Sequence, residues 1–245
     1  MQNQQLQAEI APLGVDGLTI RFGQVLSEPA NRAALALRAA LDGAGFDGVE
    51  ESSTALTSVY LRFRGVARAV VLAQVQTLVN SRDWSDAPLP EGRRLWRVPT
   101  VFGGPLAPQL DTAAAQAGVS AAQAIAEICA APLRVQTIGF APGQPYLGPL
   151  PAHWDISRQS TLTPQVPVGA LVVAIRQMVL FSVTTPTGWQ HVGQTALRLF
   201  QPDAPDPFLL RPGDEVLFAS VPAETYARLQ ADPLRGGATC ESLPT

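Results

Sequence analysis

The chain of 245 residues contains no lysine, so all 17 of its basic residues are arginines. These arginines are scattered along the sequence, and the formal net charge is −3. A protein that binds nucleic acid through its phosphates needs clustered Lys or Arg side chains. We therefore expect no nucleic-acid partner.

Cysteine and histidine are almost absent. Cys129 and Cys240 lie far apart without a CxxC motif, and His153 and His191 are the only histidines. A disulfide framework or a zinc site needs more ligands at closer spacing. We expect no metal and no disulfide.

Long apolar runs are also missing. No window holds 18 consecutive apolar residues, and the first residues, MQNQQLQAEI, lack the positive start and apolar run of a signal peptide. The sequence predicts a cytoplasmic protein that does not associate with a membrane.

Three motifs of nucleotide binding and catalysis are absent as well. The sequence has no GxxxxGK[ST] loop, no GxGxxG between a strand and a helix, and no GxSxG elbow. His191 has no Ser and Asp partners at a diagnostic spacing, which disfavours an independent catalytic triad.

What is present is ample apolar content, 47%, and clear periodicity in the first part of the chain. Apolar residues alternate in GLTIRF (17–22) and SVYLRF (58–63), which predicts strands with one buried face. Helical spacing predicts a helix capped by Ser27 and ending at Gly43, and another through Val71–Val79.

A Pro-rich polar stretch, DAPLPEGRR, follows at residue 86 and favours a connection between folding units. We therefore predict two domains, residues 1–88 and 89–245. The second begins with two helices, the later one capped by Ser120. Its remainder predicts a closed or sandwiched β domain, with short apolar runs between Pro and Gly clusters: LRVQTIGF, ALVVAI, MVLFSVTT, TALRLF and EVLFASV.

The segment GFAPGQPYLGPLP (139–151) is unusual for a surface turn, because Pro and Gly surround Phe140 and Tyr146. Such a loop can fix the directions of its backbone N–H groups while the two aromatic rings form apolar walls of a ligand site. A well-packed crossover of the barrel is the alternative interpretation.

The segment TPTGWQHVGQT (185–195) predicts a bend that presents Trp189 and His191 to one cleft. His191 could then exchange protons near neutral pH. The alternative is a packed turn with Trp189 in the core. Further on, RPGDEVLF predicts a tight turn in which Asp214 bonds local backbone, and Asp203 and Asp206 are expected to be solvated.

Five stretches taken together resemble one family: APLG, GFAPGQPYLGPLP, VPVGALVVAI, PTGWQHVGQT and LLRPGDEV. The resemblance covers nearly the whole chain. It is to the B subunit of 5-oxoprolinase, the kinase inhibitor KipI and allophanate hydrolase subunit 1, which share a carboxyltransferase domain of the subdomain C and D type. This resemblance implies an α+β protein, with an N-terminal ferredoxin-like α/β sandwich followed by a C-terminal cyclophilin-like β-barrel.

The resemblance also implies a function. The B subunit of 5-oxoprolinase works with homologues of the C and A subunits in the ATP-dependent opening of the 5-oxoproline lactam to glutamate. ATP and a small-molecule amide substrate are thus expected, in a hydrolase that is not autonomous. The site residues expected on this basis comprise a catalytic His191 and a binding set: Phe140, Pro142, Gly143, Gln144, Tyr146, Arg176, Gly188 and Trp189.

Two other functions stay open at this point: a KipI-like protein that inhibits a sensor histidine kinase, and an allophanate hydrolase or another component of a urea pathway. The chain also departs from the family pattern. Gln109, Gln144 and Thr187 stand where the family typically has Asp, Phe and Gly. Ile128 and Cys129 stand near the place of a family His. An expected Arg is missing near 162–163, and Arg158 or Arg176 is a candidate substitute.

Overall fold

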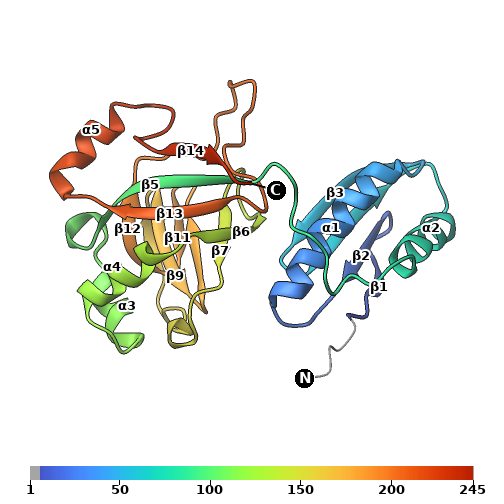
Figure 1. The fold of residues 1–245 in the computed structure, drawn as a ribbon, viewed down its shortest axis with the longest axis horizontal. Helices are drawn as coiled ribbons and strands as arrows, with labels where there is room; N and C mark the ends of the chain where they lie inside the picture. The colour runs from blue at the N-terminus through green and yellow to red at the C-terminus, as the bar shows by residue number, and fades with distance from the viewer. Residues whose placement is uncertain (1–5, 245) are drawn as a thin grey trace. The chain divides into compact units, whose positions relative to one another are not determined.

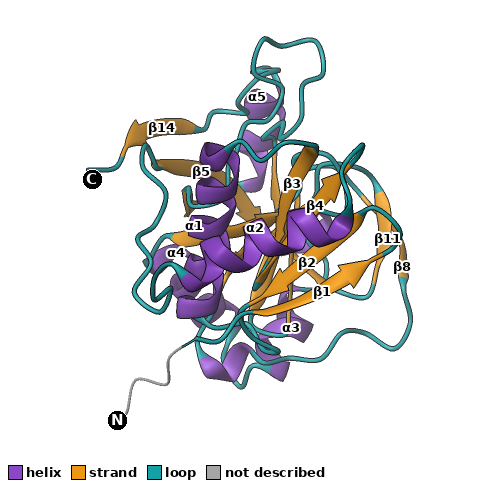
Figure 2. Ribbon diagram, turned by 90° about the vertical axis from the view of Figure 1, so that its right-hand side faces the viewer, coloured by secondary structure: helices purple, strands orange, loops and turns teal. Residues whose placement is uncertain are grey.

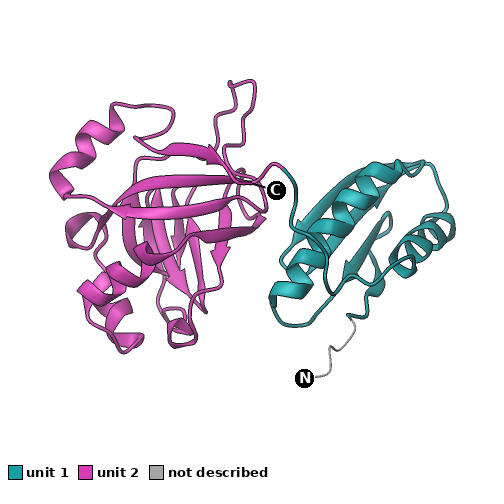
Figure 3. Ribbon diagram, viewed as in Figure 1, with its two compact units in different colours: residues 1–91 teal, residues 92–245 magenta. Residues whose placement is uncertain are grey.

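The computed structural model describes residues 6–244, and the chain divides into two compact units, residues 1–91 and 92–245 (Figure 3). Each unit has a hydrophobic core of its own. None of the helices described is long and apolar enough to cross a membrane.

The first unit is a four-stranded antiparallel sheet with two helices on one face (Figure 2). The strand order is β1-β2-β4-β3. The elements are β1 (Glu9–Leu13), β2 (Gly17–Arg21), α1 (Glu28–Ala44), β3 (Val49–Ala55), β4 (Ser58–Phe63) and α2 (Arg68–Asn80). The run from β2 to α2 follows the ferredoxin-like order, and β1 fills the edge beside β2.

The alternating pattern in the sequence produces this core. Leu18 and Ile20 of β2 and Val59 and Leu61 of β4 are at most 1% exposed, and all four face the helices. Their neighbours in the sequence point to the other face, as the period of two requires. The two strands predicted in this region are confirmed.

The first helix begins as predicted but ends further along the chain. Ser27 accepts a hydrogen bond from the backbone N–H of Ala30, so it caps α1. The predicted end at Gly43 was wrong, because Gly43 stays helical and Gly45 adopts the left-handed conformation, with φ of 58°. A left-handed C-cap is the usual place for glycine.

The second unit is a closed β-barrel with helices against it (Figure 1). Its helices are α3 (Leu110–Gln116), α4 (Ala121–Ala130) and α5 (Tyr226–Gln230). Its strands are β5 (Arg94–Phe102), β6 (Leu133–Ile138), β7 (Pro145–Gly148), β8 (Thr163–Val166), β9 (Ala170–Ala174), β10 (Gln177–Leu180), β11 (Thr185–Thr187), β12 (Gln190–Thr195), β13 (Glu215–Ser220) and β14 (Thr239–Ser242).

The barrel closes through a pairing between β12 and β5. The order around it is β12-β9-β10-β7-β6-β13-β5. In addition, β14 pairs with β5. β8 and β11 form a separate antiparallel pair. Closure removes most strand edges, which would otherwise be open to pairing with other chains. The predicted fold class is confirmed.

The two faces of the barrel strands carry different apolar clusters. All seven barrel strands contribute to the larger cluster, for example through Leu147, Leu171 and Met178, so this cluster fills the interior. The alternate residues of β9 and β10 join a smaller cluster with Val166 and Trp189. Because side chains alternate along a strand, this smaller cluster lies on the outer face of the barrel.

One predicted strand was wrong. TALRLF (195–200) was expected to be a strand, but β12 ends at Thr195 and the residues after it are not in a strand, apart from a bridge between Phe200 and Phe208. The strand lies earlier, over Gln190–Thr195, where a bend was expected. All six of its residues are buried, and they pair with both β9 and β5, so tertiary pairing overrides the glycine at 193.

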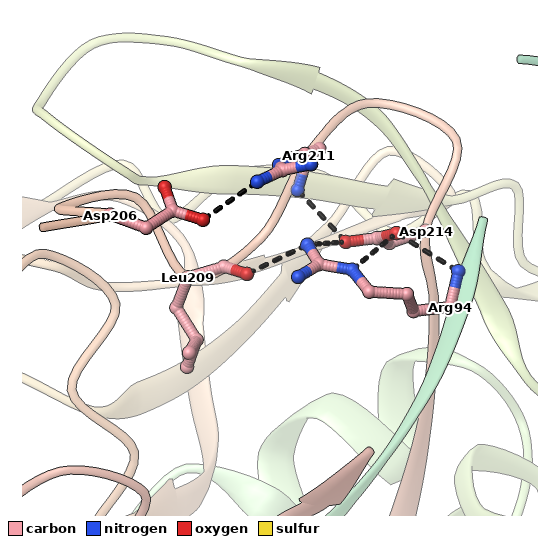
Figure 4. Close-up of polar contacts among 5 residues, drawn as sticks. All are labelled: Arg94, Asp206, Leu209, Arg211 and Asp214. Carbon is pink, nitrogen blue, oxygen red and sulfur yellow. Dashed lines mark hydrogen bonds and ion pairs between the residues drawn. The ribbon is translucent and has the colours of Figure 1, made fainter. Parts of the chain in front are cut away.

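A partly buried ion pair holds the start of β5 to the turn before β13 (Figure 4). The Asp214 carboxylate accepts hydrogen bonds from the Arg94 side chain and from the backbone N–H groups of Arg94 and Arg211. Arg94 also donates to the Leu209 carbonyl. The predicted bond from Asp214 to local backbone is confirmed, and Arg94 is the partner that sequence reasoning missed.

Candidate functional site

A cavity of about 290 Å³ lies on the outer face of the barrel, over the smaller apolar cluster. Its floor consists of Val179 and Phe181, around the end of β10. The residues around that floor come from three loops and from β7 and β11: Phe140, Gln144, Tyr146, Arg158, Gln159, Leu162, Thr185, Pro186, Thr187, Gly188 and Trp189.

Aromatic rings and a guanidinium make one wall of this cavity. The rings of Tyr146 and Trp189 meet edge to face, with centroids 6.2 Å apart and planes at 79°. The Arg158 guanidinium carbon lies 5.4 Å from the centroid of the Trp189 ring. Edge-to-face rings and a cation over an indole both fix the orientation of the side chains involved.

The 139–151 loop contributes Phe140, Gln144 and Tyr146 to the cavity lining, and internal hydrogen bonds hold the loop. The N–H of Gly139 donates to the carbonyl of Gln144 at 3.0 Å, and the N–H of Gln144 donates to the carbonyl of Ala141 at 3.1 Å. Gly143 has φ of 72°, and a Cβ there would lie 2.8 Å from the Leu199 carbonyl oxygen. The loop therefore needs glycine at this position to pack against the barrel.

Phe140 is the most unusual residue of this loop. Its φ is 71°, in the left-handed region that bulky residues rarely adopt, and its side chain is 75% exposed. A strained backbone conformation that presents an exposed aromatic ring at a cavity rim is a recurrent feature of binding sites. Neither packing nor a hydrogen bond of the side chain explains this conformation.

Two carboxamides line the cavity beside the aromatic wall. Gln144 is 2% exposed and accepts a hydrogen bond from the N–H of Ser182 at 3.4 Å. Gln159 donates to the Trp189 carbonyl at 2.9 Å. Gly188 lets this wall approach closely, since a Cβ at that position would lie 3.2 Å from the Gln159 carbonyl oxygen.

The structure brings together five of the nine residues predicted for the site. Phe140, Gln144, Tyr146, Gly188 and Trp189 all line the cavity. The other four do not line it. Pro142 and Gly143 lie within the same loop, Arg176 lies in the β9–β10 turn, where it donates to the Leu150 carbonyl, and His191 lies on β12.

Several residues of the cavity carry no local signal in the sequence. Arg158 appeared only as a candidate cation, and Gln159 was not anticipated. Leu162, which precedes the place of the missing Arg, lines the cavity. The segment 156–162 has no periodicity, and tertiary contacts bring it over Trp189: the pairing of β8 with β11 and the hydrogen bonds of Gln159. Gly188 permits the close approach of this segment, and it is the one residue in the sequence that could have indicated the contact.

His191 is 5% exposed, so it does not face solvent. Its backbone N–H donates to the Gln109 side chain at 2.6 Å and its carbonyl accepts from the Gln109 N–H at 3.0 Å. Burial lowers the pKa of the imidazole, while hydrogen bonds to Gly193 and Gln194 partly oppose that shift. The ring is therefore neutral at pH 7.

The burial of His191 predicts a pH-dependent stability. Its folded pKa is lowered below the unfolded value of 6.5, so the unfolded chain binds the proton first as the pH falls. The free energy of unfolding should decrease from about pH 6.5 downwards, by up to about 1.4 kcal/mol per pH unit. Above that pH both states carry neutral imidazole and the effect vanishes.

Urea unfolding at pH 7.5, 6.5 and 5.5 measures this slope. We expect His191→Gln to flatten it. A slope that survives His191→Gln would contradict the assignment.

The described residues that line the cavity include no aspartate, glutamate or histidine. The same part of the chain holds no cluster of three or more potential metal ligands. The cavity can thus hold a flat group against its apolar lining, pair an anion with Arg158 and hydrogen-bond a carbonyl or amide. It offers no ordinary proton acceptor to a reaction.

Another cavity, of about 300 Å³, lies around Arg198, Tyr226 and Asp232. Asp232 already accepts hydrogen bonds from the backbone N–H groups of Leu234, Arg235 and Gly237, which lower its pKa. Its carboxylate is therefore engaged in holding the local turn. No aromatic wall of the kind seen at Trp189 and no predicted site residue lines this second cavity, among the residues described there.

A known protein family matches the part of the chain that contains the cavity at Trp189. A family model described as carboxyltransferase domain, subdomain C and D, matches residues 8–210. The chain belongs to this family. The match spans most of both compact units and includes every residue described as lining the cavity.

Curated relatives of the chain share one name. The B subunit of 5-oxoprolinase from Bacillus subtilis is 30% identical over 227 residues, which is 89% of this chain and 95% of the relative. The protein of the same name from Escherichia coli O157:H7 is 36% identical over 150 residues, 61% of this chain and 68% of the relative.

Solved structures show the same fold inside longer chains. TTHA0988 is 30% identical with a TM-score of 0.71, and the match covers 84% of this chain but 40% of that one. The urea amidolyase of Kluyveromyces lactis has a TM-score of 0.76 at 16% identity, covering 98% of this chain and 16% of the enzyme. The latter likeness shows the fold alone.

Proposed function

We propose that this chain is the component of an ATP-dependent 5-oxoprolinase that corresponds to its B subunit. Together with a homologue of the C subunit, it would open the lactam ring of 5-oxoproline to glutamate. A homologue of the A subunit is a further expected partner. The name shared by the curated relatives supports this proposal. The observation that carries it is a cavity equipped to bind a small planar amide, with no acid or base among its described lining residues.

The side chains of the cavity suit such a substrate. 5-Oxoproline is a small flat ring with a lactam and a carboxylate. The ring fits against Trp189 and Tyr146, and the carboxylate fits the Arg158 guanidinium. The amide of Gln144 offers a hydrogen bond to the lactam. These residues bind and orient the substrate, and another protein of the complex supplies the proton transfers.

The same cavity does not fit ATP by itself. Among its described lining residues Arg158 is the one cation, whereas a triphosphate carries several negative charges. A volume of about 290 Å³ also lies at the small end for ligand sites. We therefore assign no nucleotide contact to these residues, and ATP use is proposed only for the assembled complex.

Co-expression tests the proposal directly. The chain is produced with homologues of the C and A subunits, and ATP hydrolysis is measured with and without 5-oxoproline. We expect a stable heteromer whose ATP hydrolysis depends on 5-oxoproline, and no turnover by the isolated chain. A heteromer that ignores 5-oxoproline would refute the substrate, and activity with allophanate in its place would indicate the urea-pathway alternative.

The second candidate is a KipI-like binding protein that inhibits a sensor histidine kinase. The exposed ring of Phe140 and the absence of acid or base in the described cavity lining favour it, since both suit docking without chemistry. Inhibition of kinase autophosphorylation by the isolated chain, with no heteromer formed, would select this function.

Arg158→Ala tests which cation binds the substrate. Loss of one exposed charge-assisted contact should raise KM for 5-oxoproline about tenfold, with kcat little changed. Arg176 lies outside the cavity, so Arg176→Ala should have a much smaller effect. The reverse order, measured in steady-state kinetics of the heteromer, would move the anion site to the β9–β10 turn.

A further inference from the structure

Gln109 lies at the start of α3, outside the cavity, yet it hydrogen-bonds to both segments that form the cavity's Trp189 wall. It pairs with His191 through two bonds: its backbone N–H donates to the His191 carbonyl at 3.0 Å and its Oε1 accepts from the His191 N–H at 2.6 Å. One residue thus takes both backbone groups of His191, as a neighbouring strand would. This pairing fixes the position of the Gln109 side chain next to β12.

The other end of the same carboxamide reaches the opposite segment. Its Nε2 donates to Gln159 Oε1 at 2.9 Å and to Thr163 Oγ1 at 3.1 Å. Because a backbone N–H can only donate, the contact with His191 identifies Oε1, and the donor end must then face Gln159. The orientation of Gln109 therefore determines the orientation of the Gln159 amide.

Gln159 in turn hydrogen-bonds to two residues that line the cavity, Gly188 and Trp189. With its Oε1 engaged by Gln109, its Nε2 donates to the Trp189 carbonyl at 2.9 Å. Its backbone N–H donates to the Gly188 carbonyl at 2.6 Å. The adjacent Arg158 is the residue that lies over the Trp189 ring. A continuous chain of amides thus connects α3, β12, the 187–189 turn and the 158–163 segment.

We propose that Gln109 is a positioning residue for this cavity: its carboxamide holds the segment that carries Arg158 and Gln159 over Trp189. The inference deepens the proposed function, because it assumes that this cavity binds the substrate. The position requires an acceptor and a donor on one side chain at this length. Glutamate keeps the length and the acceptor but not the donor, and asparagine is one methylene too short.

Gln109→Glu is accordingly the sharpest variant, because it is nearly isosteric. The carboxylate still accepts from the His191 N–H. Gln159 must then turn its NH₂ toward the new carboxylate, so that its Oε1 faces the Trp189 carbonyl and the bond between them is lost. Gln165→Glu is the matched control, since Gln165 is an exposed residue of β8 that does not line the cavity.

Amide hydrogen exchange of the isolated chain tests the role without reference to any reaction. We expect Gln109→Glu to speed exchange about tenfold in peptides covering 158–163 and 187–189, and to leave β13 and the first unit unchanged. Gln165→Glu should change neither. Uniformly faster exchange across the second unit, with a lower Tm, would show a merely structural role and overturn the proposal, as would unchanged exchange.

Kinetics of the heteromer supply the second readout. Gln109→Glu and Gln109→Asn should both raise KM for 5-oxoproline about tenfold while kcat stays within about threefold. A fall in kcat at constant KM would contradict positioning of the binding wall. If the wild-type heteromer has no 5-oxoproline-dependent activity, the proposed function fails, whereas the exchange experiment still decides the role of Gln109.

Discussion

Asp214→Ala should lower the free energy of unfolding of the second unit by about 3 kcal/mol, at the low end of values for breaking a buried ion pair. The melting temperature should fall by roughly 6–12 °C in consequence. The Asp214 side chain is 3% exposed and that of Arg94 is 21% exposed. The alanine variant leaves the guanidinium half-buried without its counter-charge.

The size of this effect follows from what the carboxylate does. Burial by itself lowers the pKa of Arg94, and the hydrogen bond and charge of Asp214 more than offset this, so the pKa ends above its usual value. The same carboxylate also satisfies the backbone N–H groups of Arg94 and Arg211. Alanine removes all of these acceptors at once, and unpaired buried donors are costly.

Asp206→Ala is the matched control, because it also removes a carboxylate that pairs with an arginine of the same cluster (Figure 4). Its ion pair with Arg211 is open to solvent, with the side chains 58% and 62% exposed. Such pairs contribute at most about 1 kcal/mol. Thermal and urea unfolding measure the stability of the two variants. Equal losses in the free energy of unfolding would show that the Asp214 ion pair does not hold β5 to the turn before β13.

This ion pair shows which contacts can be predicted from the sequence and which cannot. The Pro-Gly-Asp triplet at 212–214 identifies a turn in which Asp214 bonds local backbone, because that contact spans three residues. Arg94 lies 120 residues away and meets it only because β5 and β13 pair in parallel. Local chemistry is encoded in neighbouring residues, whereas the partner depends on strand order.

The same distinction applies to the fold. Alternation at Leu18 and Ile20, and the caps at Ser27 and Ser120, are local signals and were predicted correctly. The strand over Gln190–Thr195 was mistaken for a bend, because Gly188 and Gly193 suggest a turn. Here both glycines instead permit close approach, of the 158–162 segment at Gly188 and of Thr100 at Gly193.

The candidate site likewise combines residues that the sequence predicts with residues that it does not predict. The 139–151 loop was identified from its composition, and three of its residues line the cavity. The part of the lining with Arg158 and Gln159 has no local pattern in the sequence, because Gln109 and the β8–β11 pair hold it in place. The role of Arg158 and Gln159 in substrate binding is a proposal, which the Gln109 and Arg158 variants test.

Phe140→Gly should separate stability from function. Glycine adopts φ of 71° without strain, and the 75% exposed ring contributes little to packing, so the free energy of unfolding should stay level or rise by as much as about 1 kcal/mol. The aromatic rim is lost, however, and with it an apolar wall of the cavity. We expect KM of the heteromer for 5-oxoproline to rise between about 10- and 100-fold.

Ile175→Gly is the control for this experiment. Ile175 has φ of 45° and is 42% exposed, but it lies in the β9–β10 turn and does not line the cavity. The same relief of backbone strain is therefore expected, without any change in KM. If Phe140→Gly behaved like Ile175→Gly in both measurements, the strained conformation of Phe140 would have no part in binding. A rise in KM confined to Phe140→Gly would instead mean that the loop tolerates its strain because the exposed ring contacts the ligand or the partner that closes over it.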